Sequence, residues 1–167
     1  RRLLEAGDAV LLTGPAADAF ARAAGLAMVA PSYFTTERRL RNLHCPIVTS
    51  VNGPAAGAGM SFALMGDIIL CARSSYFLQA FRRIGLVPDC GSTWLLPRMI
   101  GKARSVELSL MGERLPAEKA LEWGLVSKVV PGDQLMGEAM AMAQSIAKQP
   151  THSLRVANQL LRHGTQA

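Results

Sequence analysis

The chain has 167 residues, of which half are apolar and 18% are charged. This balance is typical of one folded globular domain and excludes an intrinsically disordered chain. The formal net charge of +6 favours an anionic partner, but the arginines and lysines are scattered, so we interpret most of them as solvated surface. A phosphate-bearing small molecule is the next candidate, and the lack of a basic stretch with interleaved aromatics predicts no nucleic-acid partner.

The cysteines, histidines and hydrophobic runs indicate the cellular location of the protein and whether it binds a metal or a membrane. Cys45, Cys71 and Cys90 are odd in number and lack C-x-x-C spacing, which predicts reduced thiols and a cytoplasmic location. The three histidines have no ligand-like spacing, so we expect no metal. No apolar run reaches the roughly 18 residues of a membrane span, so we expect no membrane partner. Because the chain begins with Arg1 rather than Met, we expect that it is a fragment.

Three short apolar runs predict buried strands at residues 8–14, 46–53 and 67–73. The 13 residues from 54 to 66 have room for a short crossover helix, and a strand–helix–strand order predicts a parallel sheet. Further on, residues 115–130 predict a helix followed by a strand, and residues 132–150 predict an amphipathic helix. Thr151 is expected to cap a terminal helix. We therefore divide the chain into a core at 1–150 and the start of a C-terminal helical region at 151–167.

Small residues gather where the second strand is expected to end. Gly and Ala occupy six of the eight positions from 53 to 60, and a helix is expected to start near Ala58. The first N–H groups of a helix have no partner within it, so a ligand oxygen could approach them. From the spacing alone, tight packing of the helix on the strand explains these residues equally well.

Two longer segments carry a resemblance to a known family. The segments "PIVTSVNGPAAGAGMSFALMGDIILCA" and "FRRIGLVPDCGSTWLLPRMIGKARSVELSLMGERLPAEKALEWGLVSKVV" resemble the enoyl-CoA hydratase/isomerase (crotonase) family. The resemblance implies a crotonase-like α/β fold, a spiral of ββα units with a parallel sheet and packed helices. It also implies an acyl-CoA thioester substrate, no cofactor other than the coenzyme A of that substrate, and a homotrimer or dimer of trimers with an oligomerisation region at the C-terminus.

The resemblance also implies an oxyanion hole. In the family, two backbone N–H groups stabilise the enolate of the thioester carbonyl, and the second of them corresponds here to Ala58, in a turn shaped by Gly57 and Gly59. The first donor should follow the strand at 8–14, but the family pattern breaks after Phe20. We expect that a loop is missing from the sequence at this point.

The position of acidic residues favours an isomerase over a hydratase. By resemblance, the two glutamates of the hydratases correspond to Ser61 and Phe81, neither of which is acidic. Asp89 remains, at a place where several isomerases of the family carry an acid, and one carboxylate can remove a proton and return it elsewhere. Phe81, Val87 and Pro88 are expected to contact the substrate and to surround Asp89 with apolar groups that disfavour its charged form.

We therefore expect an acyl-CoA isomerase of the enoyl-CoA or ring-1,2-epoxyphenylacetyl-CoA type, with Asp89 as acid and base. Three alternatives stay open. Asp89 also corresponds to the nucleophilic aspartate of 4-chlorobenzoyl-CoA dehalogenase, which would attack an aromatic ring. The chain could instead be a hydratase of the same family, or a non-catalytic scaffold that keeps only the assembly.

Overall fold

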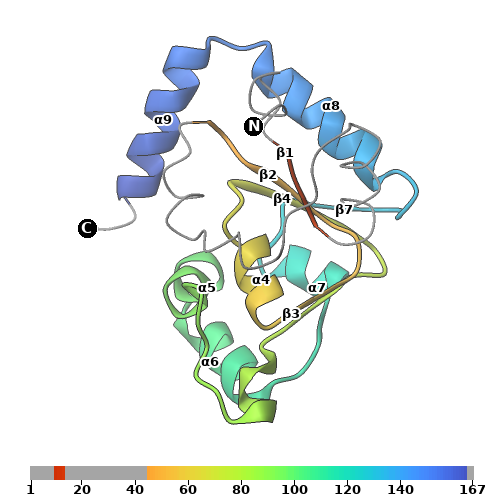
Figure 1. Ribbon diagram of the computed structural model, residues 1–167, viewed down its shortest axis with the longest axis vertical. Coiled ribbons are helices and arrows are strands. Elements are labelled where there is room, and N and C mark those ends of the chain that lie inside the picture. The colour runs from red at the N-terminus through yellow and green to blue at the C-terminus, as the bar shows by residue number, and fades with distance from the viewer. Residues whose placement is uncertain (1–9, 14–44, 165–167) are drawn as a thin grey trace, which may run out of the picture.

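The structure is a computed structural model that describes residues 10–13 and 45–164. Figure 1 shows a small central sheet with helices on both sides. The strands are β1 Val10–Thr13, β2 Val48–Val51, β3 Pro54–Ala56, β4 Ile68–Ala72, β5 Tyr76–Leu78, β6 Leu115–Pro116 and β7 Lys128–Val130. The helices are α4 Ala58–Ala63, the 3-10 helix η2 Ala80–Ile84, α5 Ser92–Ile100, α6 Lys102–Met111, α7 Ala117–Glu122, α8 Leu135–Ala147 and α9 Thr151–Gly164.

The predicted parallel sheet is confirmed. Its described strands run in the order β1-β2-β4-β7 and every neighbouring pair is parallel. In the register, Val48 pairs with Val10 on one side and with Ile68 on the other. The apolar runs at 8–14, 46–53 and 67–73 therefore supply three adjacent strands of one sheet.

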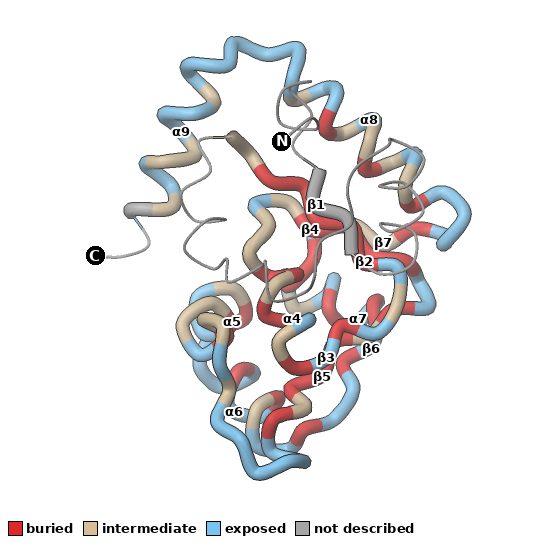
Figure 2. Tube along the Cα trace, in the orientation of Figure 1, coloured by how far each residue is buried: buried red, intermediate tan, exposed pale blue. Residues whose placement is uncertain are grey.

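Side chains of this sheet alternate between two hydrophobic cores, as the two-residue period of a strand requires. One face of β2 and β4 carries Val48 and Leu70, which pack with Leu135 and Ala139 of α8. The opposite face carries Val51, Ile69 and Cys71, which belong to a larger core with residues of α4, α5, α6 and α7. Figure 2 shows the buried residues concentrated along these strands and the exposed ones along α9 and the outer loops. Burial on both faces explains why the strands are continuous apolar runs.

A second, smaller sheet was not predicted from the sequence. It has the order β3-β5-β6, with β3 parallel to β5 and β5 antiparallel to β6. Its strands are two or three residues long. From β2 to α6 the chain twice passes from the first sheet to the second and then into helix, which gives the repeated ββα units expected from the resemblance.

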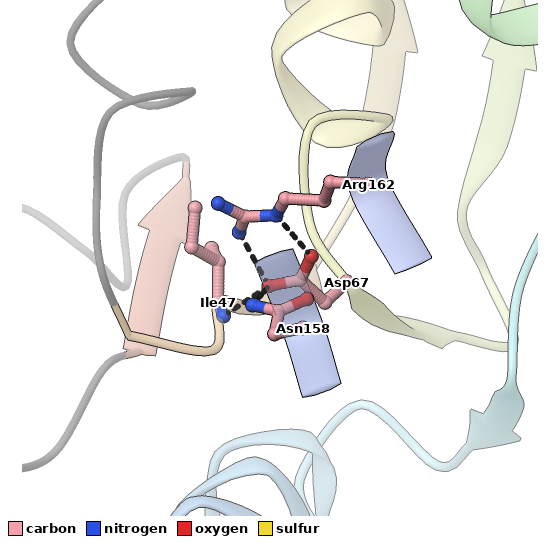
Figure 3. Close-up of polar contacts among 4 residues, drawn as sticks. All are labelled: Ile47, Asp67, Asn158 and Arg162. Atoms are coloured by element: carbon pink, nitrogen blue, oxygen red, sulfur yellow. Dashed lines mark hydrogen bonds and ion pairs between the residues drawn. The ribbon is translucent and has the colours of Figure 1, made fainter. Parts of the chain in front are cut away.

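The C-terminal helix α9 is tied to the sheet by one carboxylate, drawn in Figure 3. Asp67, just before β4, accepts two hydrogen bonds from the Arg162 guanidinium, at 2.9 Å from Nε and 2.6 Å from Nη2. It also accepts from the Asn158 amide at 3.1 Å and from the Ile47 backbone N–H at 2.7 Å. Asp67 therefore joins the starts of β2 and β4 to a helix more than 90 residues away. The expected terminal helix is confirmed, but Thr151 is its first residue and not its N-cap, because the Leu154 N–H donates to the Pro150 carbonyl at 3.2 Å. The role of this helix in assembly stays a prediction.

Candidate active site

The glycine turn has the geometry that the sequence predicted, with α4 beginning at Ala58. Gly57 precedes the helix with φ 55° and ψ −126°, a conformation that residues with a Cβ rarely adopt. Its N–H donates to the Leu78 carbonyl at 2.9 Å, which continues the pairing of β3 with β5. The turn is thus fixed by the second sheet, and its unusual backbone sets the direction of the next peptide group.

By resemblance, the Ala58 N–H is the expected oxyanion donor, and this role stays a prediction. As the first residue of α4, it has no acceptor for its N–H inside the helix, and this N–H forms no hydrogen bond with another described residue. The helix has only six residues, so its dipole is small, and the donor is the N–H group itself. Such a group can bind an oxygen that gains negative charge.

Phe81 lies beside this turn. Its side chain is 6% exposed, and its Cζ atom is 3.8 Å from the place that a Cβ on Gly57 would occupy. The phenyl ring therefore packs against the turn at the position where, by resemblance, a hydratase carries its second glutamate. The predicted contact between Phe81 and substrate stays a prediction.

Asp89 lies between η2 and α5, and its backbone carbonyl is firmly held. This carbonyl accepts hydrogen bonds from the Ser92 N–H and the Ser92 hydroxyl, both at 3.1 Å. It also accepts from the Ser61 hydroxyl at 3.2 Å. Because Ser61 is three residues into α4 after Ala58, about 5 Å along the helix, these contacts bring the acid loop to the glycine turn. The Asp89 carboxylate forms no hydrogen bond or ion pair with another described residue.

The expected apolar enclosure of Asp89 is wrong for the described part of the chain. Asp89 is exposed, Val87 is 80% exposed and Pro88 is half-buried. The segment from 86 to 89 has no regular secondary structure and packs little of its side-chain surface on the core. Val87 and Pro88 therefore do not enclose Asp89. Of the three apolar candidates, Phe81 is the one that is buried near the turn.

Two arginines directly after Phe81 are engaged in structure. Arg82 donates to the Leu110 carbonyl, and Arg83 donates to the Gly112 carbonyl at 3.0 Å. Both acceptors lie at the C-terminal end of α6, where a helix favours positive charge. At least one donor of each guanidinium is thereby used to fix η2 against α6 rather than to bind an anion.

The cysteines are free thiols, and two of them resist ionisation. Burial in β4 raises the pKa of the Cys71 thiol from 9.0 to about 11, with a smaller contribution from the negative charge of Glu118. Burial also raises the pKa of Cys45, and Arg162 partly offsets this shift. Because the thiolate is the nucleophilic form, Cys71 is inert at neutral pH.

Beyond the glycine turn and the acid loop, the described residues form an apolar groove but no cluster of metal ligands. Within 10–13 and 45–164, no three His, Cys, Asp or Glu side chains lie together as metal ligands. None of the helices described in these ranges is long and apolar enough to cross a membrane. A shallow, mainly apolar groove of about 240 Å³ lies between α5 and α6, with Leu96, Pro97, Val106 and Leu110 in its walls. Ser92, which bonds the Asp89 carbonyl, also lines the groove, whereas Ala58, Phe81 and Asp89 do not.

Comparison with known proteins identifies the family. Residues 5–167 match the family described as enoyl-CoA hydratase/isomerase. The chain belongs to the enoyl-CoA hydratase/isomerase family. The resemblance seen in the two quoted segments is thus confirmed and extends over nearly the whole chain.

Two curated relatives from this family differ in the activity that their names state. The chain is 46% identical over 150 residues to the 1,2-epoxyphenylacetyl-CoA isomerase of Escherichia coli K12, an alignment that covers 89% of this chain and 55% of the relative. It is 43% identical over 106 residues to a probable enoyl-CoA hydratase of Rhodobacter capsulatus, with coverage of 64% and 41%. The chain therefore spans about half the length of the curated relatives it matches.

Solved structures of family members confirm the crotonase-like fold. An enoyl-CoA hydratase/isomerase from Pseudoalteromonas atlantica T6c superimposes with a TM-score of 0.76 at 33% identity, covering 84% of this chain and 58% of the other. An enoyl-CoA hydratase from Bacillus anthracis gives a TM-score of 0.77 at 33% identity, with coverage of 80% and 52%. The fold predicted from the resemblance is correct.

In this family member, the structure also reveals site features that sequence reasoning missed. The Ser61 and Ser92 hydroxyls, both on fully buried residues, hold the Asp89 carbonyl. No local pattern could predict the first of these contacts, because it joins residues 28 positions apart. The first oxyanion donor and the break after Phe20 lie outside the described residues.

Proposed function

We propose that the protein is an acyl-CoA isomerase that uses the Ala58 N–H to bind the thioester oxygen and Asp89 to move a proton. The observation that carries the proposal is the hydrogen bond that holds the loop containing Asp89 next to the helix that begins with Ala58. Asp89 is the acid of the loop that Ser61 holds against the first turn of α4. Its carboxylate is exposed and unpartnered among the described residues, so a substrate can reach it.

The proposed reaction needs one base and one oxyanion donor. Asp89 takes a proton from the carbon next to the thioester carbonyl of a 3-enoyl-CoA, and the electron pair spreads onto the carbonyl oxygen and the double bond. The Ala58 N–H stabilises the negative oxygen, a contribution of roughly 3–4 kcal/mol for one such donor. The same Asp89 then returns the proton to carbon 4, and the double bond moves from carbon 3 to carbon 2. Atoms and charge balance without a cofactor, and the coenzyme A belongs to the substrate.

The likeness to an epoxyphenylacetyl-CoA isomerase supports isomerisation over hydration. Hydration is the second candidate because relatives of similar identity carry hydratase names. Two residues argue against it. The Ser61 hydroxyl is bound inside the protein, and the Phe81 phenyl ring cannot transfer a proton. Neither residue can replace the acid pair that positions and activates water in the family's hydratases.

A substrate panel with the intact protein tests the proposal. We expect conversion of a 3-enoyl-CoA to the 2-enoyl-CoA, or conversion of a ring-epoxidised phenylacetyl-CoA, and negligible hydration of crotonyl-CoA followed by ultraviolet absorbance. Rapid hydration of crotonyl-CoA with no isomerisation would contradict the proposal. With a halobenzoyl-CoA under single-turnover conditions, added mass on Asp89 would instead favour the dehalogenase alternative. Failure to bind any acyl-CoA would favour a non-catalytic scaffold.

A further inference from the structure

Ser61 is a buried residue whose hydroxyl connects helix α4 to the loop that contains Asp89. The residue is 0% exposed, and its hydroxyl lies 3.2 Å from the Asp89 carbonyl and 3.4 Å from the Gly57 carbonyl. A hydroxyl has one hydrogen to donate at a time. The Gly57 carbonyl already accepts the Ser61 backbone N–H at 3.1 Å, so the shorter contact to Asp89 is the main use of the hydroxyl.

The turn after Asp89 needs such support because its backbone is strained. Cys90 has φ 49° and is the one non-glycine residue with positive φ in the described part of the chain. Gly91 follows with φ 79°, so two consecutive residues are left-handed just before α5. A left-handed non-glycine residue is energetically unfavourable and persists where surrounding contacts impose it.

The three hydrogen bonds to the Asp89 carbonyl differ in what they join. Both bonds from Ser92 are local, spanning three residues at the start of α5. The bond from Ser61 spans 28 residues and comes from the helix that begins with Ala58. Of these three bonds, it alone fixes the acid loop relative to the oxyanion donor.

We propose that Ser61 is a positioning residue, whose hydroxyl sets the distance between the Asp89 carboxylate and the Ala58 N–H. This inference rests on the proposed isomerase function. It gives a specific role to the position where, by resemblance, a hydratase carries its first glutamate. In this chain that position anchors the base through its backbone instead of supplying an acid.

Ser105 provides a matched control. Like Ser61, it is a buried serine in the first turns of a helix, and its hydroxyl bonds the carbonyl of the glycine that caps that helix, Gly101, at 2.7 Å. No hydrogen bond joins it to the acid loop. Each serine-to-alanine change removes one buried hydroxyl: Ser61→Ala removes the hydrogen bond to the Asp89 carbonyl, whereas Ser105→Ala removes a local one to Gly101.

The experiment measures kcat, KM and the Kd for a non-reactive acyl-CoA in the intact wild type and both variants. A displacement of about 1 Å can cost about 100-fold in rate, so we expect Ser61→Ala to lower kcat by about 10- to 100-fold with Kd unchanged within about 2-fold. Ser105→Ala should keep kcat within about 2-fold. Equal kcat in the two variants would overturn the inference, as would a parallel loss of kcat and acyl-CoA binding in Ser61→Ala. If Ser61→Ala does not fold, Ser61→Cys fills the site with a larger side chain that is a weaker donor, and it is judged in the same way.

Amide hydrogen exchange separates this inference from the proposed function. Loss of the Ser61 bond should speed exchange over residues 90–94 in Ser61→Ala and leave it unchanged in Ser105→Ala. A wild type that isomerises no acyl-CoA would overturn the proposed function, and with it the catalytic role of Ser61. A wild type that isomerises, together with a Ser61→Ala variant of unchanged kcat and unchanged exchange, would overturn the positioning role alone.

Discussion

Asp67 and Asp89 are both held by hydrogen bonds, but through different groups. The Asp67 carboxylate accepts four hydrogen bonds, from one backbone N–H and two side chains of α9. Asp89 accepts three hydrogen bonds at its backbone carbonyl, and its carboxylate has no partner among the described residues. The carboxylate oxygens of Asp67 are engaged in hydrogen bonds within the protein, so we assign Asp67 a structural role. The loop of Asp89 is fixed through its backbone carbonyl, which leaves the carboxylate oxygens available to a substrate.

The largest effect is expected at the glycine turn, where one substitution should change both stability and rate. Gly57→Ala places a Cβ in ordinary contact with Phe81 at 3.8 Å, so its effect must come from the backbone at φ 55°. We expect a loss of about 1–3 kcal/mol in the free energy of unfolding and about a 100-fold fall in kcat, because the strained peptide redirects the Ala58 N–H.

Gly59→Ala is the control for the turn. Gly59 is exposed in α4, and nothing lies within 4 Å of an added Cβ. Alanine is favoured over glycine in a helix, so stability should be unchanged or rise by up to about 1 kcal/mol. Wild-type kcat in both variants would mean that the turn has no catalytic role.

Asp67→Ala should affect stability and not chemistry. The change removes the carboxylate oxygens that accept hydrogen bonds from the Ile47 N–H, Asn158 and Arg162, and the partly exposed position of Arg162 lets water compensate in part. We expect the free energy of unfolding to fall by about 1–3 kcal/mol in denaturant titration, with kcat of the folded protein retained. Glu122→Ala breaks the exposed pair with Lys119 and should cost less than about 0.5 kcal/mol. Equal losses in these two variants would show that the cluster in Figure 3 does not anchor α9.

The buried thiol predicts an effect on stability that is confined to alkaline pH. Unfolded Cys71 ionises near 9.0 and the folded thiol near 11, so between these values the unfolded state loses the proton first. Stability from Cys71 is therefore complete below about pH 9 and falls as pH rises to 11, by on the order of 2 kcal/mol. Denaturant titrations at pH 8 and pH 10.5 should show a smaller pH effect in Cys71→Ala than in wild type. Equal pH effects would contradict the assigned shift.

The sequence predicts most strongly what depends on neighbouring residues. The apolar runs around Val48 and Ile69 predict β2 and β4, because strands buried on both faces have no polar alternation. The glycine turn predicts the start of α4 at Ala58. The second sheet was missed because strands of two or three residues are too short to show a period.

Contacts between distant residues limited the prediction of the site. The Ser61 bond to Asp89 spans 28 residues, and the Arg162 bonds to Asp67 span 95. Enclosure of Asp89 was expected from its apolar sequence neighbours, but Val87 points its surface to solvent. A neighbour in sequence need not pack on the residue beside it, so burial could not be derived from the local pattern.

The most direct test of the central claim compares Asp89→Asn with Asp133→Asn, a change at another exposed aspartate outside the site. The measurement is the rate of 3-enoyl-CoA isomerisation in the intact protein, with acyl-CoA affinity measured alongside. Asparagine keeps the shape of Asp89 and removes the base, so the rate should fall by roughly 10²–10⁴-fold while affinity and stability stay near wild type. Asp133→Asn should change none of these. An Asp89→Asn variant that isomerises at the wild-type rate would contradict the account.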